Sequence, residues 1–384
     1  MIRDSESLAA LVDTVRRFVT ERLVPLEAQV DETDRIPDEL VEEMRELGLF
    51  GLSVPEEYGG LGLTMEEEVH VAFELGKTSP AFRSLIGTNN GIGSQGIIAD
   101  GSEEQKRYWL PKIASGEVIA SFALTEPEAG SDAASLRTTA VRDGDEYILN
   151  GTKRFITNAP RAGVFTLMAR TGGPGAGGVS AFLVEADRPG LSLGKVDRKM
   201  GQRGTMTCDV ILSDCRVPAS NIIGGVPGIG FKTAMKVLDR GRLHISAVCV
   251  GVAERLIEDS LRYAMERVQF GKPIGDFQLV QAMLADSRTE AFAARCMVLE
   301  TARLKDEGKP ITEEAAATKL FASEMVGRVA DRNVQIHGGA GYMADYAAER
   351  FYRDVRLFRI YEGTSQIQQV VIAREMMRRA GKSK

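Results

Sequence analysis

Apolar residues near the start of the chain recur every three or four positions, the spacing of a helix that buries one face. This face consists of Leu8, Leu11, Val12, Val15, Phe18, Val19 and Leu23. A second helix is predicted to begin near Pro37 and to end at Gly48. Thr64 and Ser102 are each followed three residues later by Glu or Gln, the pattern of a capping box. Residues 1–120 are therefore predicted to form a helical domain.

The pattern changes to that of strands after about residue 118. Short runs rich in Val, Ile, Thr and Phe alternate with turns, and Asp143-Gly144-Asp145 is typical of a hairpin turn. We predict that residues 121–225 form a β-barrel or sandwich domain. The expected strands are 136–142 and 146–149 on either side of the hairpin turn, then 164–169, 179–185 and 207–212.

Helical spacing returns after residue 225 and continues to the end of the chain. Long segments at 231–270, 277–307 and 312–337, joined by short connections, are typical of an antiparallel helix bundle. A Gly-rich break at 338–341 precedes two shorter predicted helices. Residues 226–384 are therefore predicted to form a C-terminal bundle, and the fold class is a multi-domain α+β protein.

The composition is that of a globular protein, with 384 residues, 43% of them hydrophobic, and a formal net charge of −6. A mildly acidic chain predicts neither a nucleic-acid partner nor a membrane partner. Residues 1–23 include four acidic side chains, unlike a targeting peptide, so we expect a cytoplasmic location. The four cysteines form no C-x-x-C pair and the three histidines are far apart in sequence. We therefore expect no metal site, and cysteines that are reduced and buried.

Two glycine-rich segments resemble nucleotide-binding motifs only superficially. Residues 173–178 match G-x-G-x-x-G, but the segment that follows has the composition of a strand, whereas the dinucleotide motif requires a helix there. The segment 225–230 lacks the Lys that must follow the last Gly of a P-loop, because Phe231 is inserted before Lys232. We interpret the first segment as a hairpin loop and the second as a helix N-terminus after a linker.

A polar turn at residues 122–132 follows an apolar run and offers hydroxyl groups and free backbone amides. On its own, this segment fits either a loop with capping residues or an edge that receives a flat heterocycle. Its carboxylates, Glu126, Glu128 and Asp132, are interpreted as turn and capping residues rather than as an acid–base pair.

Four segments together resemble the signatures of the acyl-CoA dehydrogenase flavoenzymes, and they occur in the order found in that family. They are residues 122–132, 267–274, 335–342 (continuing through Asp345, Arg350 and Asp354) and 361–368. The division into helical, β and helical parts matches the family over essentially the whole chain. The pair Gly241-Arg242 makes the pattern similar to the short- and medium-chain straight-acyl members.

The resemblance implies a FAD enzyme that oxidises an acyl-CoA thioester to its trans-2-enoyl form. Glu362 would remove the α-proton while the β-hydrogen leaves as hydride to flavin N5. An apolar pocket would raise the pKa of this carboxylate, and the family polarises the thioester carbonyl with the backbone N–H at 362 and a flavin hydroxyl. Some members place the base on the helix after the middle domain, where this chain has Gly241, which cannot accept a proton.

The resemblance also implies the binding residues. The flavin ring would be contacted by Phe122, Leu124, Thr125, Gly130, Ser131, Phe155, Ile156 and Thr157. The rest of FAD would be held by Arg267, Phe270, Gln278, Gln335, Ile336, Gly338, Gly339, Thr364 and Gln366, with Arg267 and Gln278 reaching the FAD of a neighbouring subunit. The substrate would be contacted by Ser131, Asp239, Arg242 and Gly363.

Because cofactor contacts cross a subunit boundary in the family, the resemblance implies a homotetramer, a dimer of dimers, that passes electrons to electron-transferring flavoprotein. Two residues depart from the family pattern. Phe155 stands where Trp is common, which keeps ring stacking but loses an N–H donor. Glu128 replaces a frequent Gly and either adds charge near a phosphate-bearing ligand or points into solvent.

Three other functions compete with this one. An acyl-CoA oxidase of the same fold usually has a much longer chain, and a non-catalytic module that binds FAD or CoA would not need Glu362. The third alternative, a nucleotide-hydrolysing protein, is suggested only by the P-loop match, which fails. The length of the acyl group depends on the depth of a pocket formed by packed side chains, so the motifs do not define it.

Overall fold

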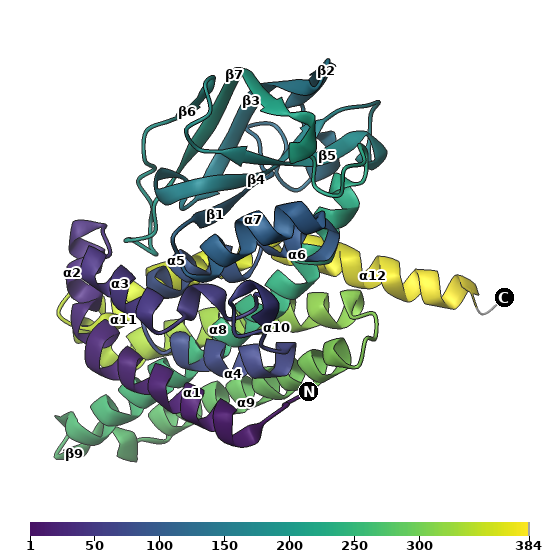
Figure 1. Ribbon diagram of the computed structural model, residues 1–384. Coiled ribbons are helices and arrows are strands. Elements are labelled where there is room, and N and C mark those ends of the chain that lie inside the picture. The colour runs from purple at the N-terminus through teal and green to yellow at the C-terminus, as the bar shows by residue number, and fades with distance from the viewer. Residues whose placement is uncertain (383–384) are drawn as a thin grey trace.

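The computed structural model describes residues 1–382, with helices at both ends of the chain and a sheet between them (Figure 1). The expected helical first part is confirmed, and Leu8, Val15 and Phe18 of the predicted apolar face are buried. Both predicted capping boxes are present, at Thr64 and at Ser102. The helices are α1 (Ser5–Phe18), α2 (Glu27–Thr33), α3 (Asp38–Glu46), α4 (Met65–Leu75), α5 (Pro80–Asn90), α6 (Gln95–Asp100) and α7 (Glu103–Ala114).

The predicted β middle part is a curled seven-stranded sheet with the order β1-β4-β2-β3-β7-β6 and β5 beside β4. The predicted Asp-Gly hairpin joins β2 to β3, where Arg142 lies opposite Tyr147. The strand that follows residues 173–178 is also confirmed, so these glycines lie in a hairpin loop. The strands are β1 (Ile119–Ala123), β2 (Thr139–Asp143), β3 (Glu146–Thr157), β4 (Ala162–Arg170), β5 (Val179–Glu185), β6 (Leu191–Leu193) and β7 (Thr207–Pro218).

The last part is a bundle of long helices, as predicted, and Gly230 begins the first of them after the linker. One expected end was wrong: the first long helix ends at Glu266 and not at Phe270, because the next residues form a small hairpin of strands β8 (Val268–Gln269) and β9 (Lys272–Pro273). The helices are α8 (Gly230–Glu266), α9 (Gln278–Asp306), α10 (Thr312–His337), α11 (Ala347–Val355) and α12 (Ser365–Lys382).

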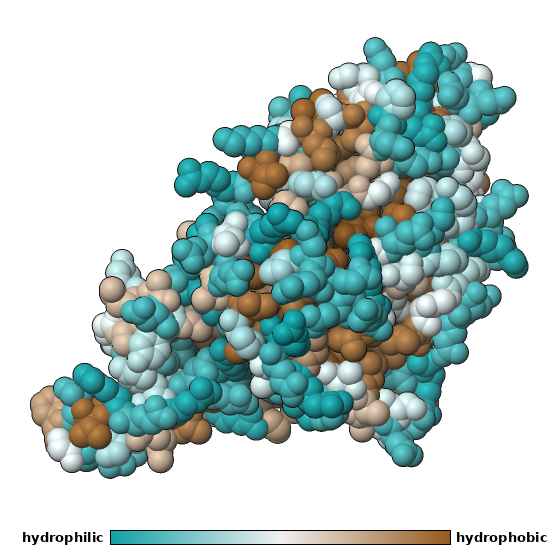
Figure 2. Space-filling view, turned by 60° about the vertical axis from the view of Figure 1, so that its left-hand side comes forward, coloured by the Kyte–Doolittle hydropathy of each residue, from teal (hydrophilic) through white to brown (hydrophobic). Residues whose placement is uncertain are grey.

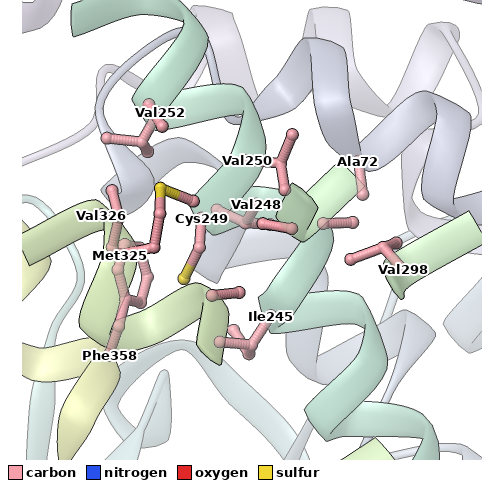
Figure 3. Packing of buried hydrophobic residues seen from close by; sticks show 14 of the residues in the cluster. Ala72, Ile245, Val248, Cys249, Val250, Val252, Val298, Met325, Val326 and Phe358 are labelled. Atoms are coloured by element: carbon pink, nitrogen blue, oxygen red, sulfur yellow. The ribbon is translucent and has the colours of Figure 1, made fainter. Parts of the chain in front are cut away.

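One apolar cluster joins the N-terminal helices to the bundle. Side chains of α4, α8, α9 and α10 interlock around Val248, Cys249 and Met325, all of them fully buried (Figure 3). On the outside, hydrophobic residues reach the surface in patches between hydrophilic ones (Figure 2). The expectation of buried cysteines holds for Cys208, Cys215 and Cys249, but Cys296 on α9 is exposed. None of the helices in residues 1–382 has the length and apolar character needed to cross a bilayer.

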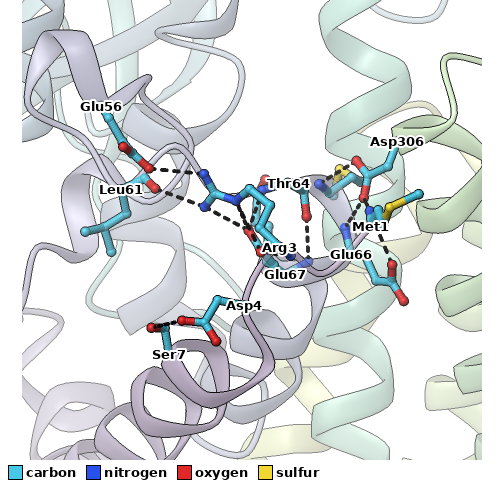
Figure 4. Close-up of polar contacts among 12 residues, drawn as sticks. Met1, Arg3, Asp4, Ser7, Glu56, Leu61, Thr64, Glu66, Glu67 and Asp306 are labelled. Carbon is cyan, nitrogen blue, oxygen red and sulfur yellow. Dashed lines mark hydrogen bonds and ion pairs between the residues drawn. The ribbon is translucent and has the colours of Figure 1, made fainter.

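The start of the chain is tied to α4 and α9 by polar contacts (Figure 4). The guanidinium of Arg3 donates to Glu67 of α4 at 3.1 Å and to Glu56 at 3.1 Å. Asp306, at the end of α9, accepts hydrogen bonds from the first backbone N–H groups of α4, those of Met65 at 2.8 Å and Glu66 at 3.0 Å. A carboxylate at this position satisfies unpaired N–H groups and interacts favourably with the helix dipole.

The packing of α4 against α8 depends on glycine. A Cβ atom added at Gly251 would lie 2.1 Å from the carbonyl oxygen of Phe73, so a side chain there forces the helices apart. We expect Gly251→Ala to lower the free energy of unfolding by ~1–3 kcal/mol, the usual effect of overpacking, although alanine favours helices by ~1 kcal/mol over glycine.

Thermal or urea unfolding of the two variants Gly251→Ala and Gly381→Ala measures this effect. Gly381, on α12, has no neighbour within 4 Å of an added Cβ, so its variant should be as stable as the parent or slightly more stable. Equal stability of Gly251→Ala and the parent would show that α4 and α8 can separate without loss.

Candidate functional site

Glu362 lies in a tight turn between α11 and α12 whose backbone is unusual. Glu362 has φ +56° and Gly363 has φ +88°, so two successive residues adopt the left-handed region, which is uncommon for a glutamate. The turn is held from two sides: Lys319 of α10 donates to the Gly363 carbonyl at 2.7 Å, and Gln368 donates to the carbonyls of Glu362 and Gly363, both at 3.0 Å. These contacts fix the direction of the Glu362 side chain.

One oxygen of the Glu362 carboxyl group is buried and has no hydrogen-bond partner among the described residues. The residue retains some exposed area, but its Oε2 atom is buried and accepts no hydrogen bond within residues 1–382. Burial raises the pKa of Glu362, and the positive charges of Arg83, Arg242 and Lys319 oppose this rise. Burial also lowers the pKa of Lys319, to about 8.

Gly241 of α8 faces this carboxylate. A Cβ atom added at Gly241 would lie 2.8 Å from Oε2 of Glu362, so this glycine leaves the space that the carboxylate uses. Two of the predicted substrate residues, Asp239 and Arg242, are on the same turn of α8 as Gly241. Arg242 is buried and donates a hydrogen bond to Asp239 at 2.8 Å. Asp239 also accepts a hydrogen bond from Thr312 at 2.8 Å, which ties α8 to α10.

The end of β1 provides the polar turn with Phe122, Leu124 and Thr125. A buried ion pair supports it: Lys153 of β3 donates to Glu126 at 2.7 Å and to the Leu124 carbonyl at 3.2 Å. Glu126 also accepts two backbone N–H groups, those of Arg137 and Thr138. The interpretation of Glu126 as a capping residue is thus supported, and its partner Lys153 is a residue that the sequence did not reveal.

The other two acids of this turn are Asp132 and Glu128, which were also interpreted as turn and capping residues. Asp132 stands at the N-cap of the short helical turn 133–135 and accepts a hydrogen bond from the Ser135 hydroxyl at 2.5 Å, but its side chain accepts none from the backbone of that turn. Glu128 is exposed, as are Gly130 and Ser131, which were expected to contact the flavin.

A bulge in β3 presents an aromatic ring at the edge of the sheet. The pairing with β7 shifts between Lys153 and Ile156, and Phe155 adopts φ +58°. Its ring is 59% exposed, with the Arg154 guanidinium 4.8 Å from the ring centroid, whereas Ile156 is buried. An exposed aromatic ring on a rigid strand, next to the half-buried Thr157, is a surface on which a flat heterocycle can stack.

One cavity, with a volume of about 50 Å³, connects the strand edge to the Glu362 turn, since Thr157 and Glu362 both line it. Several of its other lining residues were not foreseen, namely Glu68, Arg83, Arg240 and His244. Arg240 and His244 are four residues apart on α8, and this spacing could have indicated one shared helix face. Glu68 and Arg83 are on separate helices, so no sequence pattern connects them with the site.

The remaining predicted cofactor residues lie elsewhere in the chain. Arg267, Phe270 and Gln278 are exposed around the β8–β9 hairpin, at the end of the bundle far from the sheet (Figure 1). Arg267 lines a second cavity of about 420 Å³ together with His337, which precedes the glycine turn. The others divide into exposed residues, Gln335, Gly338, Gly339 and Gln366, the half-buried Gly363 and Thr364, and the buried Ile336. Within one chain these residues are therefore not brought to Glu362, apart from Gly363 and its neighbours.

Comparison with known proteins matches all three parts of the chain. The acyl-CoA dehydrogenase N-terminal domain matches residues 5–117, the middle domain residues 121–215 and the C-terminal domain residues 228–377. The sequence is 45% identical over 382 residues to an acryloyl-CoA reductase (NADH) of Anaerotignum propionicum. The aligned region covers 99% of this chain and 96% of that protein.

Solved structures agree with this comparison over nearly the full length. A chain in the structure of the electron transferring flavoprotein of Acidaminococcus fermentans has a TM-score of 0.95 at 40% identity, covering 98% of this chain and 100% of that one. The butyryl-CoA dehydrogenase of Megasphaera elsdenii has a TM-score of 0.94 at 34% identity, with coverage of 98% and 100%. The three-part fold, the turn at Glu362 and these matches together show that the chain belongs to the acyl-CoA dehydrogenase family.

Proposed function

We propose that this oxidoreductase dehydrogenates an acyl-CoA thioester to its trans-2-enoyl form with FAD, and that Glu362 is the base. One observation supports this above all: the buried, unpartnered Oε2 of Glu362 borders a cavity that reaches Thr157 at the edge of the sheet. A buried carboxylate oxygen that accepts no hydrogen bond is more basic than one in water, as removal of a weakly acidic α-proton requires.

The residues at the sheet edge fit a flavin. Phe155 offers an exposed ring for stacking, and Thr125 and Thr157 offer hydroxyl groups to the polar edge of an isoalloxazine. The Lys153–Glu126 ion pair fixes the Thr125 segment, so that this edge is rigid before any ligand arrives. A flavin held by these residues would supply the acceptor for the hydride that leaves the β-carbon, so that loss of the α-proton to Glu362 and of this hydride together form the C=C bond.

The chain itself positions and deprotonates the substrate. The Glu362 turn places a carboxylate opposite Gly241, and Lys319 and Gln368 prevent the turn from relaxing. The backbone N–H of Glu362 is proposed to donate to the thioester carbonyl, which stabilises the negative charge that develops on that oxygen. Asp239, Arg242, Gly363 and Ser131 are proposed to contact the CoA ester.

We propose a homotetramer with electron-transferring flavoprotein as the electron acceptor, in a cytoplasmic setting. Large apolar side chains at the β8–β9 end of the bundle support assembly, since Phe270 is 95% exposed and Leu279 81% exposed. These residues flank Arg267 and Gln278, which are proposed to contact the FAD of a neighbouring subunit. The likeness to a chain in an electron transferring flavoprotein structure supports the choice of acceptor.

Replacement of the base tests the proposal directly. We expect Glu362→Gln to retain FAD but to lower turnover by at least ~10²-fold, because the amide cannot accept the α-proton. The measurement is anaerobic bleaching of the flavin by an acyl-CoA, followed by steady-state assay with an artificial electron acceptor; oxygen uptake by the parent would indicate an oxidase instead.

The control for this variant is Glu300→Gln, which removes a carboxylate that pairs with Arg303 on the surface of α9. It should turn over like the parent. Normal turnover of Glu362→Gln would show that another group is the base, and a parent protein whose flavin is not bleached by an acyl-CoA would favour a binding module.

The pH dependence of the reaction should depend on Lys319. Glu362 acts only when ionised, so kcat/KM should fall as the pH decreases through its raised pKa. The charge of Lys319 lowers that pKa, so Lys319→Gln, which can still donate to Gly363, should move the acid limb of the profile to higher pH. Superimposable profiles of Lys319→Gln and the parent would show that the charge of Lys319 does not set the pKa of Glu362.

A further inference from the structure

The cavity beside Glu362 is bordered by charged side chains, although a purely apolar acyl chain calls for apolar walls. Glu68 comes from α4, Arg83 from α5, and Arg240 and His244 from α8. Glu68, Arg83 and His244 are each at least 92% buried, since their exposed fractions are 1%, 8% and 3%. Burying charge without compensation is unfavourable, so each of these groups needs a partner.

Glu68 and Arg240 satisfy each other. They form an ion pair between α4 and α8, and the positive charge of Arg240 offsets the effect of burial on the pKa of Glu68, which is nevertheless raised. One negative and one positive charge of the cavity wall are therefore balanced within the protein.

Arg83 has no such direct partner, although it lies close enough to Glu362 and Glu68 to affect the pKa of both. It forms no ion pair with the described residues, and its one side-chain hydrogen bond is to Nδ1 of His244 at 2.7 Å. Burial, with the charges of Arg83 and Arg240, lowers the pKa of His244 well below its usual range, so this histidine is a neutral acceptor. The Nε atom of Arg83 is buried and has no partner among residues 1–382.

The guanidinium of Arg83 occupies space that a glycine leaves free on its own helix. A Cβ atom added at Gly87, one turn later on α5, would lie 2.8 Å from Cζ of Arg83. Gly87 and Gly91 both line the cavity, so these two positions of the wall add no side chain that would reduce its volume. The cavity of about 50 Å³ holds more than one water but only a short acyl group.

We propose, on the basis of the proposed function, that the acyl group of the substrate is short and ends in a carboxylate, which binds Arg83. A carboxylate would accept from the N–H donors of the guanidinium and would pair with a positive charge that forms no ion pair among residues 1–382. Arginine is suited to this role because its planar fork of N–H donors matches a carboxylate. Arg83 would then select the acyl group, while Glu362 acts at its other end.

Pairs of CoA esters with equal carbon number test the proposal. We expect the holoenzyme to prefer glutaryl-CoA over pentanoyl-CoA, and succinyl-CoA over butanoyl-CoA, by at least ~10-fold in kcat/KM. Arg83→Met should abolish or reverse this preference. Arg22→Met, which removes an exposed arginine paired with Glu43, is the matched control and should retain it.

A second variant tests the proposal independently if Arg83→Met does not fold. Gly87→Ala is compatible with a helix but displaces the guanidinium, and it should reduce the preference for the dicarboxylates. Dissociation constants of the four esters for the Glu362→Gln holoenzyme report binding without turnover, and the dicarboxylates should bind more tightly by the same factor.

The outcomes separate this inference from the proposed function. If the parent oxidises pentanoyl-CoA as well as glutaryl-CoA, or if Arg83→Met leaves the ratio unchanged, the inference is overturned while the dehydrogenase function stands. If none of the four esters reduces the flavin, the proposed function fails for these substrates, and the binding ratios still decide whether Arg83 recognises a carboxylate.

Discussion

The site depends on one constraint: a carboxylate must be kept away from water and from hydrogen bonds, at a fixed place. An unpaired buried oxygen is unfavourable, and a glutamate at positive φ adds backbone strain. Neither would persist on a loop free to relax. The turn at Glu362 is held because Lys319 and Gln368 bind its carbonyls, and because the helices that supply the neighbouring groups are packed around one apolar core. The stability of the bundle thus maintains the basicity of the carboxylate.

Much of the fold could be predicted because the local signals agree with the tertiary structure. The predicted helix at 312–337 has the observed bounds, and the strand at 179–185 does as well. The end of α8 was missed because periodicity alone does not distinguish the last turn of a helix from a small hairpin. Here Phe270 adopts φ +53° next to Gly271 in the turn between β8 and β9, which the apolar pattern did not indicate.

The site was only partly accessible from the sequence. Residues of contiguous motifs, such as the Glu362 turn and the 122–132 segment, could be found because neighbours in sequence stay neighbours in space. Lys153 was missed because a lysine inside a strand is normally exposed, and only the buried Glu126 explains its place. Arg83 and Glu68 come from two helices that meet only after folding, so their burial is a tertiary property.

The charges around Glu362 also connect substrate recognition with basicity. Three positive groups lower the pKa of Glu362 and so oppose the effect of burial. Among them, Arg83 has the largest effect. A carboxylate bound at Arg83 would neutralise that charge, and the pKa of Glu362 would then rise further. The base would become stronger when the proposed substrate is in place, whereas an apolar acyl group would leave the charge of Arg83 acting on Glu362. Binding at one end of a short acyl chain can in this way favour proton removal at the other, without any movement of the backbone.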